Sequence, residues 1–370
     1  MTTIKLNISA WGSGKTSSMY QSINSVLESE RSVLIVGCSL KQLETYKSKV
    51  GSGIICSSVK SRINVKSQII SALQKAKVVY CTGIAFSTFV DTDDVDFKQV
   101  VVFLDEMLNA IETTSLTTKK SDTVSITDND SSESIILNGS FTVDTLSLYD
   151  LRALRCPWNE INIYGANALM TPFGRLLELS DIPFEIVSDF ESVDFSKVRV
   201  LCPKLSGQMT RSMKESNPYI VKSMLKVIAK NNPKQKFVYI SNSYDSIVKS
   251  RYGIRMPHNV AGDNNYRDIH IMLMLSTLNM NNPLSKKLCD LLECDRDYLT
   301  TMISVSTLFQ SAFRTSLRSD IMSGDCVIVA DAYLMGLAER HGFVKNLSIE
   351  YFDLFVPKTP KERSIKHRNN

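Results

Sequence analysis

The chain has 370 residues, of which 43% are hydrophobic and 22% are charged, a balance typical of folded proteins rather than of disordered chains. Its formal net charge of +5 permits contact with a polyanion without requiring it. No apolar stretch approaches the roughly 20 residues of a membrane-spanning helix, and the N-terminus lacks the plan of a signal peptide, so we expect a cytoplasmic protein without a membrane partner.

Apolar runs typical of strands alternate with helix-compatible stretches along most of the chain, as they do in parallel α/β layers. Some of these runs are apolar at every position, which indicates strands covered by helices on both faces. In the first half the expected strands are 4–9, 32–38, 78–81, 100–104 and 161–164. In the second half they are 184–187, 198–201, 236–241, 269–275 and 325–330. The pattern predicts two doubly wound parallel sheets in series.

A proline and a glycine, Pro172 and Gly174, follow the last strand of the first half, so the domain boundary is expected there. The prediction is a first domain over residues 1–174, a second over 175–357 and a basic tail over 358–370. The tail is either a solvated terminus without a specific partner or a contact for a polyanion.

Residues 112–140 are rich in serine, threonine and aspartate, and they are too numerous for an ordinary connection of about four to six residues. Two interpretations remain open. The segment is a mobile surface insertion, or its alternating runs 123–127 and 134–137 form a protruding hairpin that touches nucleic acid or a partner.

A glycine-rich loop lies between the first expected strand and a helix-compatible stretch. In that order, backbone N–H groups and a helix N-terminus converge on a phosphate. Lys15 would neutralise β- and γ-phosphate oxygens, and the Thr16 hydroxyl would ligate Mg²⁺. The sequence therefore predicts a bound nucleoside triphosphate, with the binding residues Gly12, Ser13, Gly14, Lys15 and Thr16.

Two carboxylates, Asp105 and Glu106, end the apolar run 100–104. Hydrolysis of a nucleotide needs a carboxylate on the metal side and a group that orients water, and these are expected at the end of a strand next to the P-loop strand. Asp105 would hold Mg²⁺, and Glu106 would orient or deprotonate the attacking water. The pair predicts a hydrolase that uses ATP and Mg²⁺.

These two motifs resemble motifs I and II of superfamily 2 helicases. The first is the stretch 9–16, with Ser9 where a full P-loop has glycine, and the second is the DExx stretch 105–108, Asp-Glu-Met-Leu. A third stretch, 310–318, resembles motif VI with Phe313 in place of the usual glycine, a form similar to that of small phage or viral origin-binding-type helicases.

The third stretch supplies charges from the second domain. On one helix, Gln310, Arg314 and Arg318 would fall on neighbouring turns of the same face and point at one γ-phosphate. Two guanidinium groups that arrive when the cleft closes would act as arginine fingers. The resemblance implies two tandem RecA-like domains with ATP in the cleft between them.

Weaker similarities occupy the places of the remaining helicase motifs. They imply nucleic-acid contacts at strand ends and a segment that couples the nucleotide site to the nucleic-acid track. The implied contacts are Ser39, Lys41, Thr82, Gly83, Ser241 and Asn242, and the implied coupling residues are Gly165, Ala166 and Asn167. Residues 262–268 lie where motif V is expected.

The resemblance implies an ATP-dependent helicase or translocase that acts on DNA more readily than on RNA. It implies replication or recombination proteins as partners, and the host cytoplasm as location if the chain is phage-encoded. Three alternatives remain open: an ATP-hydrolysing remodelling protein that separates no strands, an RNA helicase, and a P-loop kinase for a small acceptor.

Cysteines and tryptophans are not catalytic candidates. Several of the eight cysteines lie in apolar runs, so free and mostly buried thiols are expected. Cys289 and Cys294 form a close pair, but no histidine or second pair lies nearby to favour zinc. Trp11 and Trp158 could stack bases, although core or cleft-lining positions are favoured.

Overall fold

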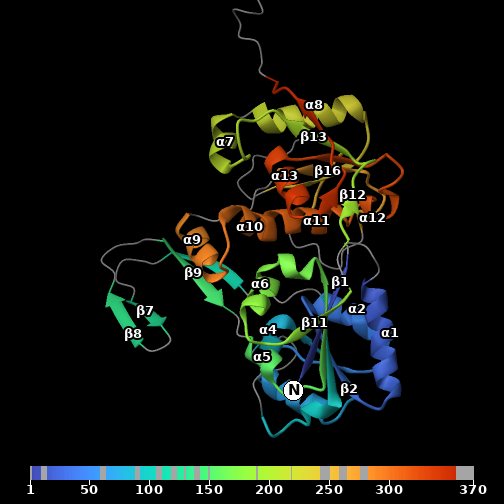
Figure 1. Ribbon diagram of the computed structural model, residues 1–370, viewed down its shortest axis with the longest axis vertical. Helices are drawn as coiled ribbons and strands as arrows, with labels where there is room; N and C mark the ends of the chain where they lie inside the picture. Colours follow the sequence, from blue (N-terminus) through green and yellow to red (C-terminus); the bar gives the residue numbers. More distant parts are fainter. Residues whose placement is uncertain are drawn as a thin grey trace, which may run out of the picture.

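The computed structural model has two lobes, each built around a parallel sheet (Figure 1). It describes residues 2–9, 15–58, 64–87, 92–105, 111–117, 123–128, 131–136, 142–148, 151–188, 191–217, 219–241, 251–257, 265–275 and 282–355.

The first lobe contains a seven-stranded sheet in which every pairing is parallel. From one edge to the other its strands are β11 (Phe184–Ser188), β1 (Thr3–Ser9), β10 (Glu160–Ala166), β5 (Val100–Asp105), β2 (Ser32–Gly37), β4 (Val78–Thr82) and β3 (Ile54–Ile55). Its helices are α1 (Lys15–Glu28), α2 (Leu40–Val50), α3 (Val65–Leu73), α4 (Gly83–Ser87), η1 (Phe97–Gln99), α5 (Arg152–Arg155), η2 (Ala168–Met170) and α6 (Pro172–Leu179).

Helices cover both faces of this sheet because successive strand residues point to opposite sides. Val33 and Ile35 pack with α1 and α2 in one hydrophobic cluster. Leu34 and Val36 belong to another cluster, which includes residues of α3, α4, α5 and α6. The fully apolar runs of the sequence are therefore strands buried on both faces, as expected.

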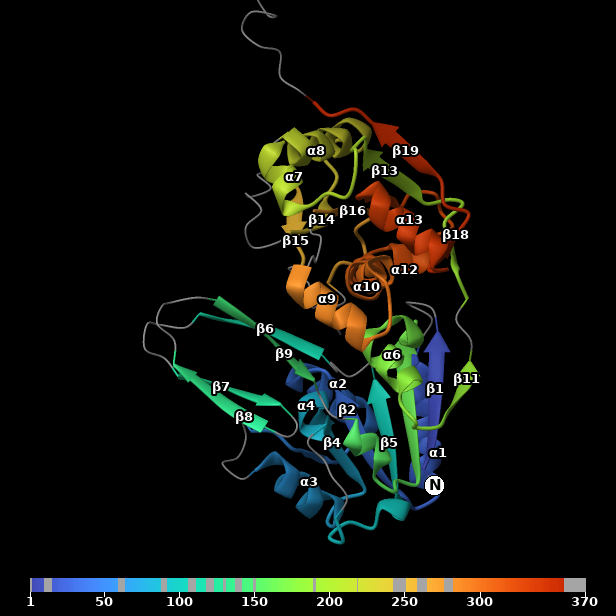
Figure 2. The same cartoon turned by 60° about the vertical axis from the view of Figure 1, so that its left-hand side comes forward.

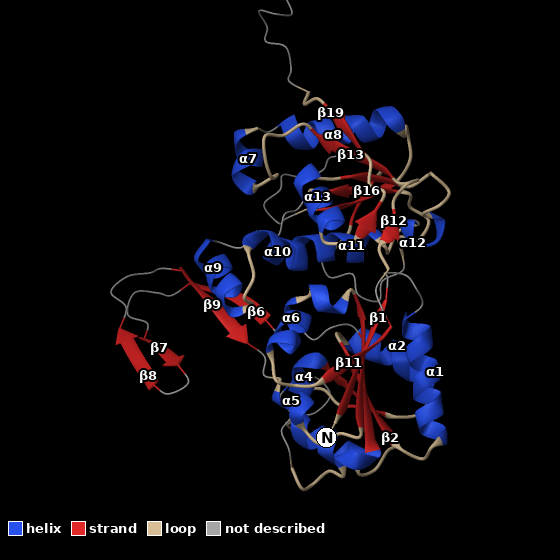
Figure 3. Cartoon of the chain, in the orientation of Figure 1, coloured by secondary structure: helices blue, strands red, loops and turns tan. Residues whose placement is uncertain are grey.

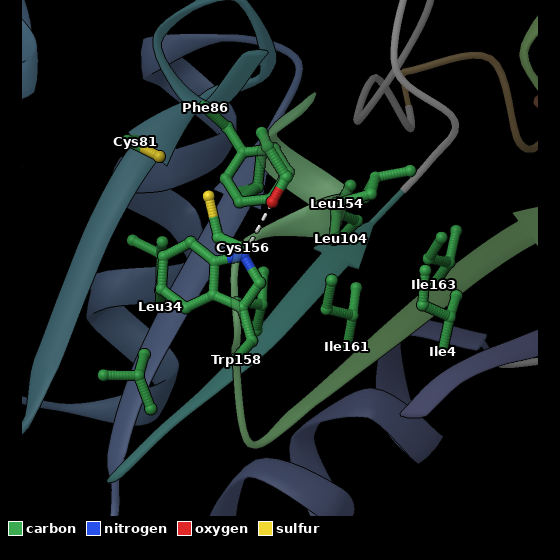
Figure 4. Close-up of a cluster of buried hydrophobic side chains, with 14 of the residues drawn as sticks. Ile4, Leu34, Cys81, Phe86, Leu104, Leu154, Cys156, Trp158, Ile161 and Ile163 are labelled. Carbon is green, nitrogen blue, oxygen red and sulfur yellow. Dashed lines mark hydrogen bonds between the residues drawn. The ribbon is translucent and has the colours of Figure 1, made fainter. Parts of the chain in front are cut away.

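Trp158 anchors the second of these clusters (Figure 4). The indole is 2% exposed, its Nε1 donates to the Ala153 carbonyl at 2.7 Å, and its ring lies edge-on to Phe97 with centroids 4.6 Å apart. Cys81 and Cys156 lie in the same cluster, where they serve as small apolar side chains. Trp158 is thus a core residue.

The second lobe contains a six-stranded sheet that is also entirely parallel. Its strands in spatial order are β15 (Gly253–Arg255), β14 (Phe237–Ile240), β16 (Ile271–Met274), β17 (Val327–Val329), β13 (Arg199–Pro203) and β19 (Ile349–Phe352), with β12 (Val193–Asp194) and β18 (Val344–Lys345) as a separate pair. Its helices are α7 (Arg211–Ser216), α8 (Tyr219–Asn231), α9 (Asn282–Leu291), α10 (Arg296–Thr300), the π-helical turn η3 (Thr301–Val305), α11 (Ser306–Ala312), α12 (Leu317–Asp320) and α13 (Ala332–Arg340). The predicted pair of doubly wound sheets is confirmed.

The run 184–187 was expected to open the second sheet, and this expectation is wrong. It forms β11, which pairs with β1 at the edge of the first sheet. Pro172 and Gly174 begin α6 instead of marking a boundary. Thr171 caps that helix by accepting from the Gly174 N–H at 3.1 Å, and a Cβ on Gly174 would lie 2.1 Å from the Ala168 carbonyl oxygen. The first sheet therefore extends past residue 174, and we propose a domain boundary after Ser188.

The polar insertion contains two antiparallel strand pairs (Figure 2). One joins β6 (Ile111–Thr117) to β9 (Thr142–Leu148), and the other joins β7 (Thr123–Asp128) to β8 (Ser131–Ile136). The second pair is the hairpin that the alternating residues predicted. The strands project to one side of the two lobes (Figure 3).

The two lobes meet through α6 of the first and α9 of the second. The Arg175 guanidinium on α6 donates to the carbonyl oxygens of Leu292 at 2.9 Å and Glu293 at 3.1 Å. Leu176 packs against a small cluster that contains Leu288 and Leu292. No helix among the described residues is long and apolar enough to cross a membrane.

Replacing Trp158 should destabilise the first lobe. We expect Trp158→Ala to lower the free energy of unfolding by about 3–5 kcal/mol, because it leaves a cavity among aromatic neighbours. Trp158→Phe should cost less, since it keeps most of the apolar surface and loses one hydrogen bond of about 1 kcal/mol. Urea unfolding followed by circular dichroism measures both. Equal losses in the two variants would contradict this account.

Candidate nucleotide site

The start of α1, which carries Lys15 and Thr16, lies on the side of the first lobe that faces the second (Figure 1). β1 ends at Ser9 and α1 begins at Lys15, so the strand is followed by the helix as predicted, and residues 10–14 between them lie outside the described residues. Lys15 and Thr16 occupy the first turn of this 14-residue helix, where the helix dipole and exposed N–H groups favour an anion. The predicted site residues Gly12, Ser13, Gly14, Glu106 and Asn242 lie outside the described residues, as do Trp11 and residues 262–264.

Asp105 is the buried carboxylate of this region. It ends β5, is 5% exposed, and accepts hydrogen bonds from the Tyr46 hydroxyl and, at 3.4 Å, from Gln42 Nε2. Burial and the Asp105 charge together raise the pKa of the neighbouring Tyr20 hydroxyl to about 12. A buried carboxylate at the end of β5, on the edge of the sheet where α1 begins, suits the oxygen ligands that Mg²⁺ prefers.

The strand of Asp105 was expected beside the P-loop strand, but β10 lies between them. Ser9 pairs with Ala166, and Tyr164 pairs with Asp105 in the next ladder. A central strand buried on both faces can occupy this position because its residues are apolar in both directions. The candidate coupling residues therefore lie at the end of β10, which pairs both with the strand that ends at Ser9 and with the strand that ends at Asp105.

The end of β10 also reaches the second lobe. Ala166 and Met170 pack against the core cluster that contains residues of α11, α12 and α13. Asn167 has a left-handed backbone (φ 49°, ψ 47°) and is 5% exposed, and its Nδ2 has no hydrogen-bond partner among the described residues. Gly165, Ala166 and Asn167 thus connect the first sheet to the second lobe.

Four of the residues proposed as nucleic-acid contacts, Ser39, Lys41, Thr82 and Gly83, follow neighbouring strands of the first sheet. β2 and β4 are neighbours, with Gly37 paired to Thr82. Ser39 caps α2 by accepting from the Gln42 N–H at 3.2 Å, and Thr82 accepts from the Ala85 N–H at 3.4 Å. Both hydroxyls therefore have a structural role at helix starts.

The remaining candidate contacts differ in exposure. Lys41 is exposed on the first turn of α2, and Gly83 is half-buried at the start of α4. Ser241 is 6% exposed at the end of β14, and its carbonyl accepts from Arg255 at 3.4 Å. Lys41 therefore offers the accessible cation of this group.

Gln310, Arg314 and Arg318 do not lie on one helix, contrary to expectation. α11 ends at Ala312, Arg314 lies in the turn that follows, and Arg318 lies in α12. The Thr315 hydroxyl bonds the Ala312 carbonyl at 2.6 Å, which gives this end of the helix a local partner. The helices α10, α11 and α12 lie on the side of the second lobe that faces the first (Figures 1 and 2).

A third arginine joins this turn and was not predicted as a site residue. Burial and the charges of Arg267 and Arg314 lower the pKa of Arg318 from its usual value. The Ser316 hydroxyl and His270 Nδ1 lie 2.9 Å apart, and the Ser316 N–H donates to the Ile269 carbonyl at 3.1 Å. These bonds hold the arginine turn against the segment that carries Arg267.

The only signal in the sequence that could have identified Arg267 is its position in the stretch 262–268, where motif V is expected. The stretch 265–268 has no regular pattern, and the spacing of Gln310, Arg314 and Arg318 predicts a helix through the turn 313–316. A cluster of like charges forms only when the segment before β16 packs against the turn after α11. Such a cluster costs stability unless an anion lies nearby.

No protein-family model matches the chain, and no curated protein matches it. Among solved structures it is similar to Xpd4 of S. tokodaii, with a TM-score of 0.57 and 13% identity over 95% of this chain and 96% of that one. An XPD helicase gives a TM-score of 0.59 and 11% identity over 95% of this chain and 96% of the other.

A third solved structure, Dbp5 of S. cerevisiae bound to RNA and ADP BeF3, has a TM-score of 0.48 and 10% identity over 99% of this chain and 88% of that one, a similarity too low to carry an argument. The two XPD similarities extend over nearly the whole chain and both sheets. The chain therefore shares the fold of these two XPD structures, with two tandem RecA-like α/β domains.

Proposed function

We propose that the chain is an ATP-dependent nucleic-acid helicase or translocase. The observation that carries the proposal is that polar and charged residues of the first lobe face an arginine-rich turn of the second lobe. Lys15, Thr16 and Asp105 lie at the carboxyl edge of the first sheet, and the turn with Arg314 and Arg318 lies on the facing side of the second lobe. Such an arrangement suits a nucleoside triphosphate whose phosphates lie between the two lobes.

The first lobe would bind the nucleotide. Lys15 and the N-terminus of α1 attract the phosphates, with Gly12, Ser13 and Gly14 as the proposed cradle. Thr16 and Asp105 would hold Mg²⁺, which supplies charge neutralisation at the phosphates when bound. Glu106 is proposed to accept the proton of the attacking water.

The second lobe would complete the site. Gln310, Arg314 and Arg318 approach the γ-phosphate when the lobes close, and their positive charge stabilises the transition state. The end of β10 transmits closure, because Ala166 packs on the second-lobe core while pairing with Ser9. Loss of the γ-phosphate releases the lobes and shifts the strand-end contacts along a nucleic acid.

DNA is the proposed track, with replication or recombination as the setting. The exposed Lys41 and the strand ends at Ser39, Thr82 and Gly83 are proposed to contact the backbone, with Ser241 and Asn242 contributing from the second lobe. ATPase rates measured with single-stranded DNA, forked duplex DNA and RNA test the proposal, alongside strand displacement. Rates that do not change with any nucleic acid would refute it, and hydrolysis without displacement would favour a remodelling protein.

Arg314→Ala should separate binding from turnover. We expect ATP affinity to stay near that of the wild type, because the first lobe holds the phosphates, while turnover falls by about 10³ or more as for removed arginine fingers. Equilibrium binding of a fluorescent ATP analogue and single-turnover hydrolysis measure the two effects. Near-normal turnover in this variant would mean that the second lobe does not complete the site.

Arg267→Gln should stabilise the folded protein at low salt. Removing one of three like charges relieves repulsion on Arg318, worth about 0.5 kcal/mol at low salt after solvent screening. The gain should disappear in high salt. Denaturant unfolding at two salt concentrations measures it, with the exposed Lys287→Gln on α9 as control. A loss of stability at low salt would contradict the proposed repulsion.

A further inference from the structure

The carboxylate at the end of β5 is held by two side chains of α2 that the proposed mechanism does not use. The Tyr46 hydroxyl donates to Asp105 Oδ2, and Gln42 Nε2 lies 3.4 Å from the same oxygen. Tyr46 is 2% exposed and Gln42 is 8% exposed. A carboxylate buried to this degree depends on such donors. The state of Asp105 is therefore linked to the position of α2.

Gln42 extends this network to the loop after β2. Its Oε1 accepts from the Cys38 backbone N–H at 2.7 Å, while its Nε2 donates to the Tyr46 hydroxyl. Its own backbone N–H donates to the Ser39 hydroxyl. One planar amide thus connects the loop that is proposed to touch nucleic acid with the carboxylate that is proposed to hold Mg²⁺.

Gly37 leaves the space that this network occupies. A Cβ at this position would lie 3.1 Å from Gln42 Oε1 and 3.3 Å from Tyr46 Cε2. It would also lie 2.9 Å from Leu43 Cδ2. β2 and β5 are direct neighbours, with Val36 paired to Leu104, so the two strand ends face the network together. Any side chain at position 37 would displace Leu43 and would shift the amide and the phenol by a few tenths of an ångström.

We propose that Gln42 and Tyr46 form a relay that couples nucleic-acid contact at residues 38–41 to the placement of Asp105. The relay rests on the proposed function and specifies how that site is regulated. A bound nucleic-acid strand that moves the Cys38 backbone rotates the Gln42 amide. That rotation changes which groups donate hydrogen bonds to Asp105. By linkage, a nucleotide at Asp105 changes the affinity of the loop for nucleic acid by the same factor. Both side chains are positioning residues.

Tyr20 provides a matched control within the same cluster. Its ring lies edge-on to that of Tyr46 with centroids 6.1 Å apart, and its hydroxyl is buried without a hydrogen-bond partner among the described residues. The Asp105 charge helps to raise the pKa of the Tyr20 hydroxyl, so the two groups interact electrostatically although Tyr20 does not donate a hydrogen bond to Asp105. Tyr20→Phe therefore removes a buried hydroxyl and leaves the relay intact.

The experiment measures coupling by binding, with the full chain. The dissociation constant of labelled single-stranded DNA is determined by anisotropy with and without a non-hydrolysable ATP analogue, and again with RNA of the same sequence. The ratio of the larger of these two dissociation constants to the smaller should fall by about tenfold in Tyr46→Phe. The ratio in Tyr20→Phe should equal that of the wild type.

Gly37→Ala supplies a second variant that removes no hydrogen-bonding group. It should reduce the ratio in the same direction, because the added methyl displaces Gln42 and Tyr46 together. Thermal unfolding of each variant establishes that it is folded, and stimulation of turnover by DNA should fall with the binding ratio. These variants keep the test valid if one substitution prevents folding.

The possible results distinguish the relay from the proposed function. A wild-type ratio in folded Tyr46→Phe and Gly37→Ala would overturn the relay and leave the helicase proposal intact. Equal losses in Tyr20→Phe and Tyr46→Phe would also overturn it, because the cluster as a whole would then be responsible. A wild-type chain that binds DNA equally with and without nucleotide, and whose turnover ignores nucleic acid, would overturn both proposals.

Discussion

Parallel strand pairing is the constraint on which the rest of this molecule depends. The carboxyl ends of all strands in a parallel sheet lie along the same edge. Residues separated by long stretches of sequence therefore come close together there. In the first lobe this brings together the ends of β1, β10, β5, β2 and β4. The carboxylate, the helix start that carries Lys15, and the strand-end loops are near one another for this single reason.

Much of the fold could be predicted because strands buried on both faces have an unmistakable composition. The run that ends at Asp105 is apolar at every position, and it is a central strand. The position of residues 184–187 could not be predicted in the same way, since an edge strand pairs with whichever sheet has a free edge nearby. β11 is largely exposed, and its composition does not identify its partner.

The candidate site was predicted in part. Lys15, Thr16 and Asp105 follow from local order along the chain. The network of Gln42 and Tyr46 depends instead on how α2 packs on β2 and β4 and reaches the end of β5. The i, i+4 spacing of Gln310, Arg314 and Arg318 predicts one helix, and this prediction is wrong. The helix ends because the Thr315 hydroxyl and the Ser316 N–H make hydrogen bonds of their own. Arg267 joins the cluster through those same tertiary bonds.

The central place of β10 has a consequence for the order of folding. Lys5 and Glu160 form an ion pair at 2.6 Å although 155 positions separate them, because β10 inserts between β1 and β5. During synthesis, β1 and β5 emerge long before the strand that joins them. Until Ala166 has left the ribosome, both have an unpaired apolar edge, and such edges are open to wrong pairing. The first lobe can therefore complete its sheet only after β10 and β11 have been made, near the midpoint of the 370-residue chain, with the polar insertion already made.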